Sequence, residues 1–219
     1  RRPLWIGGDV RTRIKVCGIT RAEDARAALD LGADFVGLVF TESPRRVTAD
    51  EARSIRRSLP SDAPVIGVFA DEPPEVVAPL ASSLSLQAVQ VAGWLEREQA
   101  FPFEVWHVLR GPDLPDPTTL PMVPLRTYHL DAWDPERAGG TGRLADWAWA
   151  ESAVQVGRRV IVAGGLTSEN VGSLVRDVRP FGVDASSGLE FAVGRKSADL
   201  IRAFVAEVRA ADQSRPKRS

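Results

Sequence analysis

The sequence predicts a single-domain α/β fold, a (β/α)8 TIM barrel, from three observations. Short apolar runs alternate regularly with helix-like segments, eight such runs can be counted, and together they fill residues 13–211. Near-continuous apolar strands that alternate with amphipathic helices are typical of parallel strands covered by helices. Eight units in about 200 residues fit a compact barrel. The rival, a doubly wound open sheet, usually has fewer strands, and no G-x-G-x-x-G motif follows the first run.

The strands are expected at the apolar runs RIKVCG (13–18), ADFVGLVF (33–40), PVIGVFA (64–70), LQAVQVA (86–92), FEVWHVLR (103–110), TYHLD (127–131), RRVIVAGG (158–165) and FGVDASSG (181–188). Helices are expected after seven of them, at about 21–31, 48–59, 74–84, 94–101, 144–152, 168–175 and 198–211. Thr48 followed three residues later by Glu51 indicates a capping box. Pro74 is well placed for a first helical turn.

The fifth strand is the exception to the alternation. The segment GPDLPDPTTLPMVP (111–124) holds too many prolines for a helix interior, so we expect a Pro-rich loop in place of the helix. Residues 1–12 are interpreted as an N-terminal extension. The polar end DQSRPKRS (212–219) is expected to be a disordered tail.

Composition excludes several classes of function. The 28 basic and 29 acidic residues give a net charge of −1, without the basic excess that nucleic acid or an anionic membrane surface attracts. Cys17 is the only cysteine, so no intrachain disulfide is possible. No run approaches the ~20 apolar residues of a membrane span, and the first ten residues lack a signal-peptide core. We therefore expect a cytoplasmic protein.

Two loops rich in small residues predict a phosphate site. Gly164 and Gly165 follow the seventh strand, and Ser186, Ser187 and Gly188 follow the eighth. Small residues let backbone N–H groups approach an anion, and barrels commonly bind phosphate at this pair of loops. The alternative is two ordinary tight turns.

Cys17 and Asp131 each end a predicted strand, where barrel enzymes place catalytic groups. A lone cysteine in an apolar run is often only a small buried hydrophobic residue. An aspartate after a strand often serves a turn or a helix cap. Position alone therefore leaves both interpretations open.

Eight blocks along the chain resemble those of the phosphoribosylanthranilate isomerases of tryptophan biosynthesis. They are KVCGIT (15–20), GADFVGLVF (32–40), SPRRV (43–47), GVF (67–69), AGGTG (138–142), DW (146–147), AGGLTSENV (163–171) and VDASSGLE (183–190). The blocks occur in the family's order and span nearly the whole predicted barrel. Together they favour catalytic roles for Cys17 and Asp131.

The resemblance implies an Amadori rearrangement of N-(5′-phosphoribosyl)anthranilate to an aminodeoxyribulose phosphate. Asp131 would be the general acid that protonates the furanose ring oxygen, and Cys17 the general base that removes the C2′ proton. Arg45 would pair with the anthranilate carboxylate, a task that suits a planar guanidinium. Other substrate-binding positions would be Gln90, Gly140, Gly164, Gly165, Asp184, Ser186 and Ser187. The resemblance implies a small phosphosugar substrate, no metal, no cofactor, and a monomer or homodimer.

This chemistry sets demands on the two groups. A free thiol has a pKa near 8.5, so a cysteine base needs something that favours the thiolate. The acid must keep its proton, so we expect burial or a nearby negative charge to raise the pKa of Asp131. Lys15 precedes Cys17 by two residues on the same strand face, and we hypothesise that its ammonium stabilises the thiolate.

Two strands depart from the family pattern. The fourth usually ends in QLHG, whereas this chain reads QVAG with Ala92 in the histidine's place. The fifth usually carries a lysine, whereas this chain has His107, which we interpret as a packed core residue. His129 faces the same way as Asp131, so it is either a neighbour of the acid or a packing residue.

Two other functional hypotheses remain at this point. A related phosphosugar barrel enzyme is one, although indole-glycerol-phosphate synthase needs lysines that are absent between Lys15 and Lys196. Ribulose-phosphate epimerase would want metal-ligating histidines, which the two present fit poorly. The other is a non-catalytic barrel that binds phosphosugars, which Ala92 keeps open and the pair Cys17 and Asp131 opposes.

Overall fold

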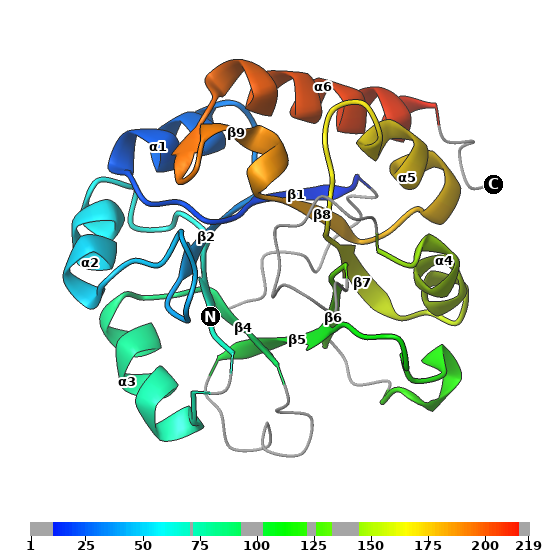
Figure 1. Ribbon diagram of the computed structural model, residues 1–219, viewed down its shortest axis with the longest axis horizontal. Coiled ribbons are helices and arrows are strands. Elements are labelled where there is room, and N and C mark those ends of the chain that lie inside the picture. Colours follow the sequence, from blue (N-terminus) through cyan, green and yellow to red (C-terminus); the bar gives the residue numbers. More distant parts are fainter. Residues whose placement is uncertain (1–10, 71, 93–102, 122–125, 133–144, 215–219) are drawn as a thin grey trace.

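Eight parallel strands close into a barrel in strict chain order, with β8 pairing back onto β1 (Figure 1). The computed structural model describes residues 11–70, 72–92, 103–121, 126–132 and 145–214. The strands are β1 (Arg13–Val16), β2 (Phe35–Val39), β3 (Val65–Val68), β4 (Ala88–Ala92), β5 (Glu104–Leu109), β6 (Thr127–Leu130), β7 (Arg159–Val162) and β8 (Gly182–Ala185). The predicted (β/α)8 barrel is confirmed.

Helices surround the barrel on its outside (Figure 1). Those in the described residues are α1 (Ala22–Asp30), α2 (Ala49–Arg57), α3 (Pro74–Ser83), α4 (Trp147–Gln155), α5 (Val171–Val178) and α6 (Ala198–Gln213). The helix expected at 94–101 lies outside the described residues. After β5 the chain forms only a short 3₁₀ turn, Pro117–Thr119, so the predicted loss of that helix is confirmed. Within the residues that the structure describes, no helix is long and apolar enough to cross a bilayer.

Local signals in the sequence fix several helix starts. Thr48 and Glu51 form the predicted capping box, in which each side chain bonds the other residue's backbone N–H. Pro74 occupies the first turn of α3, where its missing N–H costs nothing. Asp146 caps α4 by accepting from Trp149 N at 2.9 Å, so that helix begins three residues later than expected.

The last helix extends to Gln213, two residues into the segment expected to be a tail. Asp212 explains the extension, because its carboxylate accepts hydrogen bonds from the backbone N–H and the hydroxyl of Thr12. The hydroxyl contact is 2.8 Å long. This contact ties the last helix to the residue that precedes β1.

The floor of the barrel is packed with apolar side chains. One buried cluster inside it consists of Phe35, Ile66, Ala88, Trp106 and Ile161. Phe35 and Trp106 meet edge to face, with ring centroids 5.1 Å apart. The larger cluster lies between the strands and the surrounding helices. Because the interior is filled at this level, open space is left only toward the carboxyl ends of the strands.

Candidate active site

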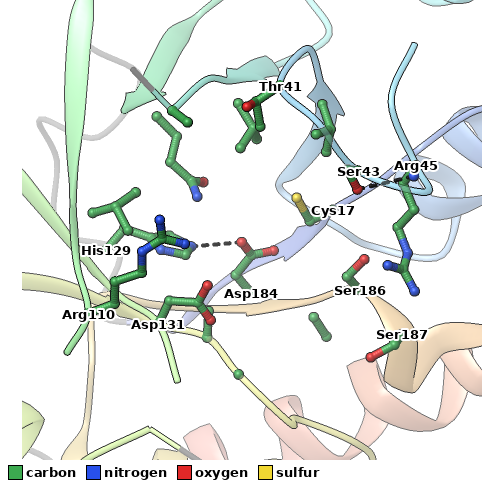
Figure 2. Close-up of a pocket in the computed structure, with 18 of the residues that line it drawn as sticks. Cys17, Thr41, Ser43, Arg45, Arg110, His129, Asp131, Asp184, Ser186 and Ser187 are labelled. Atoms are coloured by element: carbon green, nitrogen blue, oxygen red, sulfur yellow. Dashed lines mark hydrogen bonds and ion pairs between the residues drawn. The ribbon is translucent and has the colours of Figure 1, made fainter. Parts of the chain in front are cut away.

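A cavity of about 650 Å³ opens at the carboxyl ends of the strands (Figure 2). It receives side chains from the end of every strand or from the loop that follows it. The predicted site residues that line it are Cys17, Arg45, Gln90, Asp131, Gly164, Gly165, Asp184, Ser186 and Ser187. Gly140, the remaining predicted site residue, lies outside the described residues.

Cys17 and Asp131 point into this cavity from opposite sides (Figure 2). Each follows its strand directly and is held by the barrel ladder, since Cys17 N donates to Ala185 O at 2.9 Å and Asp131 N donates to Leu109 O at 3.0 Å. Gly37 makes room for the thiol, because a Cβ on that glycine would lie 2.9 Å from Cys17 Sγ. The two groups are therefore fixed by the barrel rather than by mobile loops.

The pKa of Cys17 is raised, chiefly because burial disfavours the thiolate. The ammonium of Lys15 acts in the opposite direction and lowers the pKa without overcoming the effect of burial. Lys15 is itself fully buried and donates to Asp184 Oδ2 at 2.6 Å and to Gln90 Oε1 at 3.0 Å. Its favourable influence on the thiolate, expected from the sequence, is therefore present but partial.

Burial also raises the pKa of Asp131, and the negative charge of Asp184 adds to the shift. His129 and the N–H of Ala132, which donates to Asp131 Oδ1 at 2.9 Å, act in the opposite direction. The net shift favours the protonated carboxyl, as a general acid requires.

Asp184 lies at the base of the cavity, bonded to two side chains through one oxygen (Figure 2). Oδ2 contacts Lys15 and also His129 Nε2, at 2.8 Å. Burial opposes its ionisation, but these two partners hold the pKa of Asp184 below the usual value. Within the described residues, the other oxygen, Oδ1, has no hydrogen-bond partner.

His129 and His107 therefore differ in role. His129 lines the cavity, its Nε2 lies 2.8 Å from Asp184 Oδ2, and it lowers the pKa of Asp131, so of the two alternatives the neighbour of Asp131 fits the structure. His107 is buried beside Tyr128, with ring centroids 6.2 Å apart, and does not line the cavity. Packing remains the interpretation for His107.

The loops after β7 and β8 meet because glycines remove the side chains between them. A Cβ on Gly188, after β8, would lie 2.1 Å from the carbonyl oxygen of Leu166, after β7. In the same way, a Cβ on Gly164 would lie 2.3 Å from Ala132 Cβ, so this glycine lets the loop after β7 approach the residues that follow β6. Gly164 and Gly165 also adopt positive φ angles of 87° and 62°, which glycine tolerates best. The small residues therefore bring the two loops together at one side of the cavity.

Arg45 is held from one side by a residue that the sequence analysis did not single out. Its Nε and one Nη donate to the two carboxylate oxygens of Glu190, at 2.8 and 2.7 Å. Glu190 in turn accepts from Lys196 at 2.8 Å. Glu190 belongs to the block VDASSGLE, and Lys196 is one of the few lysines in the chain. No pattern in the sequence indicates that these two side chains form an ion pair.

Arg110 is a further residue that the sequence analysis missed. It follows β5 and reaches toward the side of the cavity that holds His129 and Asp131 (Figure 2). The helix-free connection after β5 gave no sequence signal for it.

Comparison with known proteins gives a consistent result. The family described as "N-(5′-phosphoribosyl)anthranilate (PRA) isomerase" matches residues 14–207. The N-(5′-phosphoribosyl)anthranilate isomerase of Pelobacter propionicus is 43% identical over 197 residues, covering 88% of this chain and 93% of that protein. The protein of the same name from Rubrobacter xylanophilus is 41% identical over 200 residues, covering 88% of this chain and 97% of its own.

Solved structures agree. Phosphoribosylanthranilate isomerase from Thermus thermophilus superposes with a TM-score of 0.79 at 36% identity, covering 91% of this chain and 99% of the other. A phosphoribosylanthranilate isomerase solved in complex with reduced 1-(o-carboxyphenylamino)-1-deoxyribulose 5-phosphate has a TM-score of 0.75 at 32% identity, with the same coverage. The dimeric isomerase of Thermotoga maritima, in a form described as monomeric, has a TM-score of 0.78 at 34% identity, covering 91% of this chain and 99% of that one.

Proposed function

The chain belongs to the N-(5′-phosphoribosyl)anthranilate isomerase family of tryptophan biosynthesis, and we propose that it uses Asp131 and Cys17 as the acid and base of the isomerisation. It is an isomerase, and its reaction is the Amadori rearrangement of N-(5′-phosphoribosyl)anthranilate to 1-(2-carboxyphenylamino)-1-deoxyribulose 5-phosphate. The observation that carries the acid–base assignment is that the thiol and the carboxyl face one cavity from opposite sides.

The proposed reaction has two proton transfers. Asp131 gives its proton to the furanose ring oxygen, and the C1′–oxygen bond breaks to leave a Schiff base between C1′ and the anthranilate nitrogen. The thiolate of Cys17 then takes the C2′ proton, and the electron pair of that bond moves toward C1′ to neutralise the iminium nitrogen. The resulting enol-amine tautomerises to the ketone.

The electrostatics of the cavity support this division of roles. Asp184 remains charged because of Lys15 and His129, and its charge raises the pKa of Asp131. The protonated form of the acid is therefore favoured. Lys15 opposes the effect of burial on Cys17 and so acts in favour of the thiolate that a base requires.

We infer where the substrate's two anionic groups bind from the small and charged residues of the cavity. The glycine and serine residues after β7 and β8 would bind the phosphate, and Arg45, whose guanidinium lies beside Ser186 (Figure 2), would bind the anthranilate carboxylate. Ala92 lines the cavity without offering a hydrogen bond, so any polar contact made there in other family members is not made by this residue. Turnover of phosphoribosylanthranilate by the wild type tests this function against a barrel that only binds the phosphosugar.

The remaining proposals concern the state of the enzyme. We propose a monomer or a homodimer in the cytoplasm, acting on a small phosphosugar without a metal or cofactor. The dimeric relative from Thermotoga maritima supports the homodimer. Size-exclusion chromatography with light scattering tests the oligomeric state, and activity after exhaustive chelation tests the independence from metals.

Substitution of Lys15 by methionine is expected to shift to higher pH the limb of the kcat/KM–pH profile that reports Cys17. The ammonium lowers the pKa of Cys17, so its removal leaves burial unopposed and delays thiolate formation. The variant also leaves Asp184 buried with one charged partner fewer, which typically costs about 3–5 kcal/mol of stability. Kinetics from pH 6 to 10 and urea unfolding measure the two effects. An unmoved pH profile in a folded variant would rule out the influence of Lys15 on the thiol.

Substitution of Gly188 by alanine is expected to lower stability by about 1–3 kcal/mol and to weaken competitive inhibition by inorganic phosphate. The added Cβ would lie 2.1 Å from Leu166 O, so the loops after β7 and β8 must separate. Gly172→Ala is the matched control, because its Cβ would approach only the flexible ends of Arg176 and Glu207, at 3.2 Å. Equal phosphate inhibition in both variants would place the phosphate elsewhere.

A further inference from the structure

Among the described residues, the guanidinium of Arg45 is bound along one edge, by Glu190. Glu190 accepts from Nε and from one Nη, which is the side-on arrangement of an arginine–carboxylate pair. Arginine has five donors in a rigid planar fork, so the opposite edge keeps its donors for a second acceptor. Because Arg45 lines the cavity, this second edge is the one left for an anionic ligand. Glu190 thus fixes the rotation of the guanidinium plane.

The carboxylate of Glu190 is also linked, through Lys196, to the loop after β8 that would bind the phosphate. Lys196 Nζ donates to Glu190 Oε1 at 2.8 Å and to the carbonyl oxygen of Ser186 at 3.1 Å. Its backbone N–H is fixed as well, donating to the carboxylate of Asp24 in α1 at 3.1 Å. The lysine is almost fully buried, so it has few other positions. Ser186 is therefore held by a lysine that Glu190 holds.

Arg45 and Ser186, which would bind the carboxylate and the phosphate of the substrate, lie side by side. A Cβ on Gly18, directly after Cys17, would lie 2.5 Å from Arg45 Cδ and 2.9 Å from Ser186 Oγ. Figure 2 shows the guanidinium of Arg45 beside Ser186 on the same side of the cavity. Glu190 itself is only 4% exposed and accepts from both cations, which hold its pKa below the usual value although burial opposes this.

We propose that Glu190 is a positioning residue that couples the carboxylate-binding and phosphate-binding ends of the substrate site. It aims Arg45 through two hydrogen bonds and fixes Ser186 through Lys196, without touching the substrate. This inference rests on the proposed function, because it takes the ligands of Arg45 and of the β8 loop from there. Binding of both anionic groups of the substrate then depends on one carboxylate that does not itself line the cavity.

The test measures equilibrium binding to the full-length enzyme by calorimetry, so that it does not depend on turnover. The ligands are inorganic phosphate, the reduced product named above and its analogue without the carboxylate. In Glu190→Gln, we expect about tenfold weaker binding of phosphate and of the reduced product, and a smaller affinity difference between the two product analogues. Arg45→Met should remove the carboxylate preference while leaving phosphate binding within about threefold of the wild type.

Kinetics provide the second readout. Glu190→Gln should raise KM about tenfold with kcat changed less than about threefold, because Cys17 and Asp131 are untouched. Glu190→Asp, which keeps the charge but shortens its reach, should give an intermediate change at both ends. Asp199→Asn is the matched control, since Asp199 pairs with Arg202 on the exposed face of α6. Unchanged phosphate binding in both Glu190 variants would overturn the coupling, whereas an inactive wild type would refute the proposed function alone.

Discussion

Replacement of Asp131 by asparagine is expected to lower kcat by roughly 10²–10⁴-fold, the usual contribution of a positioned general acid. An amide oxygen can still accept the Ala132 N–H bond and has nearly the same shape, but an amide has no proton to give to a ring oxygen. KM should change little, because the substrate's anionic groups are bound elsewhere. Steady-state kinetics at neutral pH measure both constants.

Stability gives an independent check on this variant. Burial raises the pKa of Asp131 in the folded state, so its ionisation costs stability at pH values above the pKa of the unfolded chain. The neutral amide removes that cost, and Asp131→Asn should be at least as stable as the wild type at pH 8. Asp50→Asn, at a 92% exposed side chain, is the control and should match the wild type in kcat. A loss of activity that follows a loss of stability would mean that Asp131 is structural.

Replacement of Cys17 by serine is expected to have a similarly large effect, roughly 10²–10⁴-fold on kcat. A hydroxyl is far less acidic than a thiol, so serine supplies no anionic base near neutral pH. In the wild type, the active form has Cys17 as the thiolate and Asp131 protonated, so kcat/KM should follow a bell-shaped dependence on pH whose two limbs are set by the pKa values of these groups, both of which burial has raised. The limb that reports the thiol should disappear in Cys17→Ser.

Alkylation tests the thiol directly. Iodoacetamide should inactivate the wild type at a rate that increases as the pH rises through the pKa of Cys17, because only the thiolate reacts. The reduced product should protect against it, since Cys17 lines the cavity. Full activity after stoichiometric alkylation of Cys17 would contradict its role as the base.

The fold could be predicted largely because each strand is an apolar run bounded by turn residues. Errors were confined to the ends of helices. The end of α6 is set by Asp212 bonding Thr12, which is 200 residues away in the chain, and no local pattern reveals that pairing. The loss of the helix after β5 was visible, in contrast, because prolines exclude a helix locally.

In the candidate site too, features set by local sequence could be predicted and features set by distant contacts could not. Residues at strand ends, such as Cys17 and Asp131, could be assigned because a barrel brings all strand ends together. The ion pairs beneath them could not, since Lys15 meets Asp184 only when β1 and β8 close the barrel. Glu190 was hidden for the same reason, as its partner Arg45 lies 145 residues away in the chain.

The measurement that tests the central claim most directly is the loss of fluorescence of freshly generated phosphoribosylanthranilate. It is followed with the wild type, Asp131→Asn and Cys17→Ser, each first shown to bind the reduced product. We predict rapid loss with the wild type and almost none with either variant. A wild type that binds the reduced product but leaves the fluorescence unchanged would contradict the account. That result would identify a non-catalytic phosphosugar-binding barrel, with Ala92 as the first residue to restore to histidine.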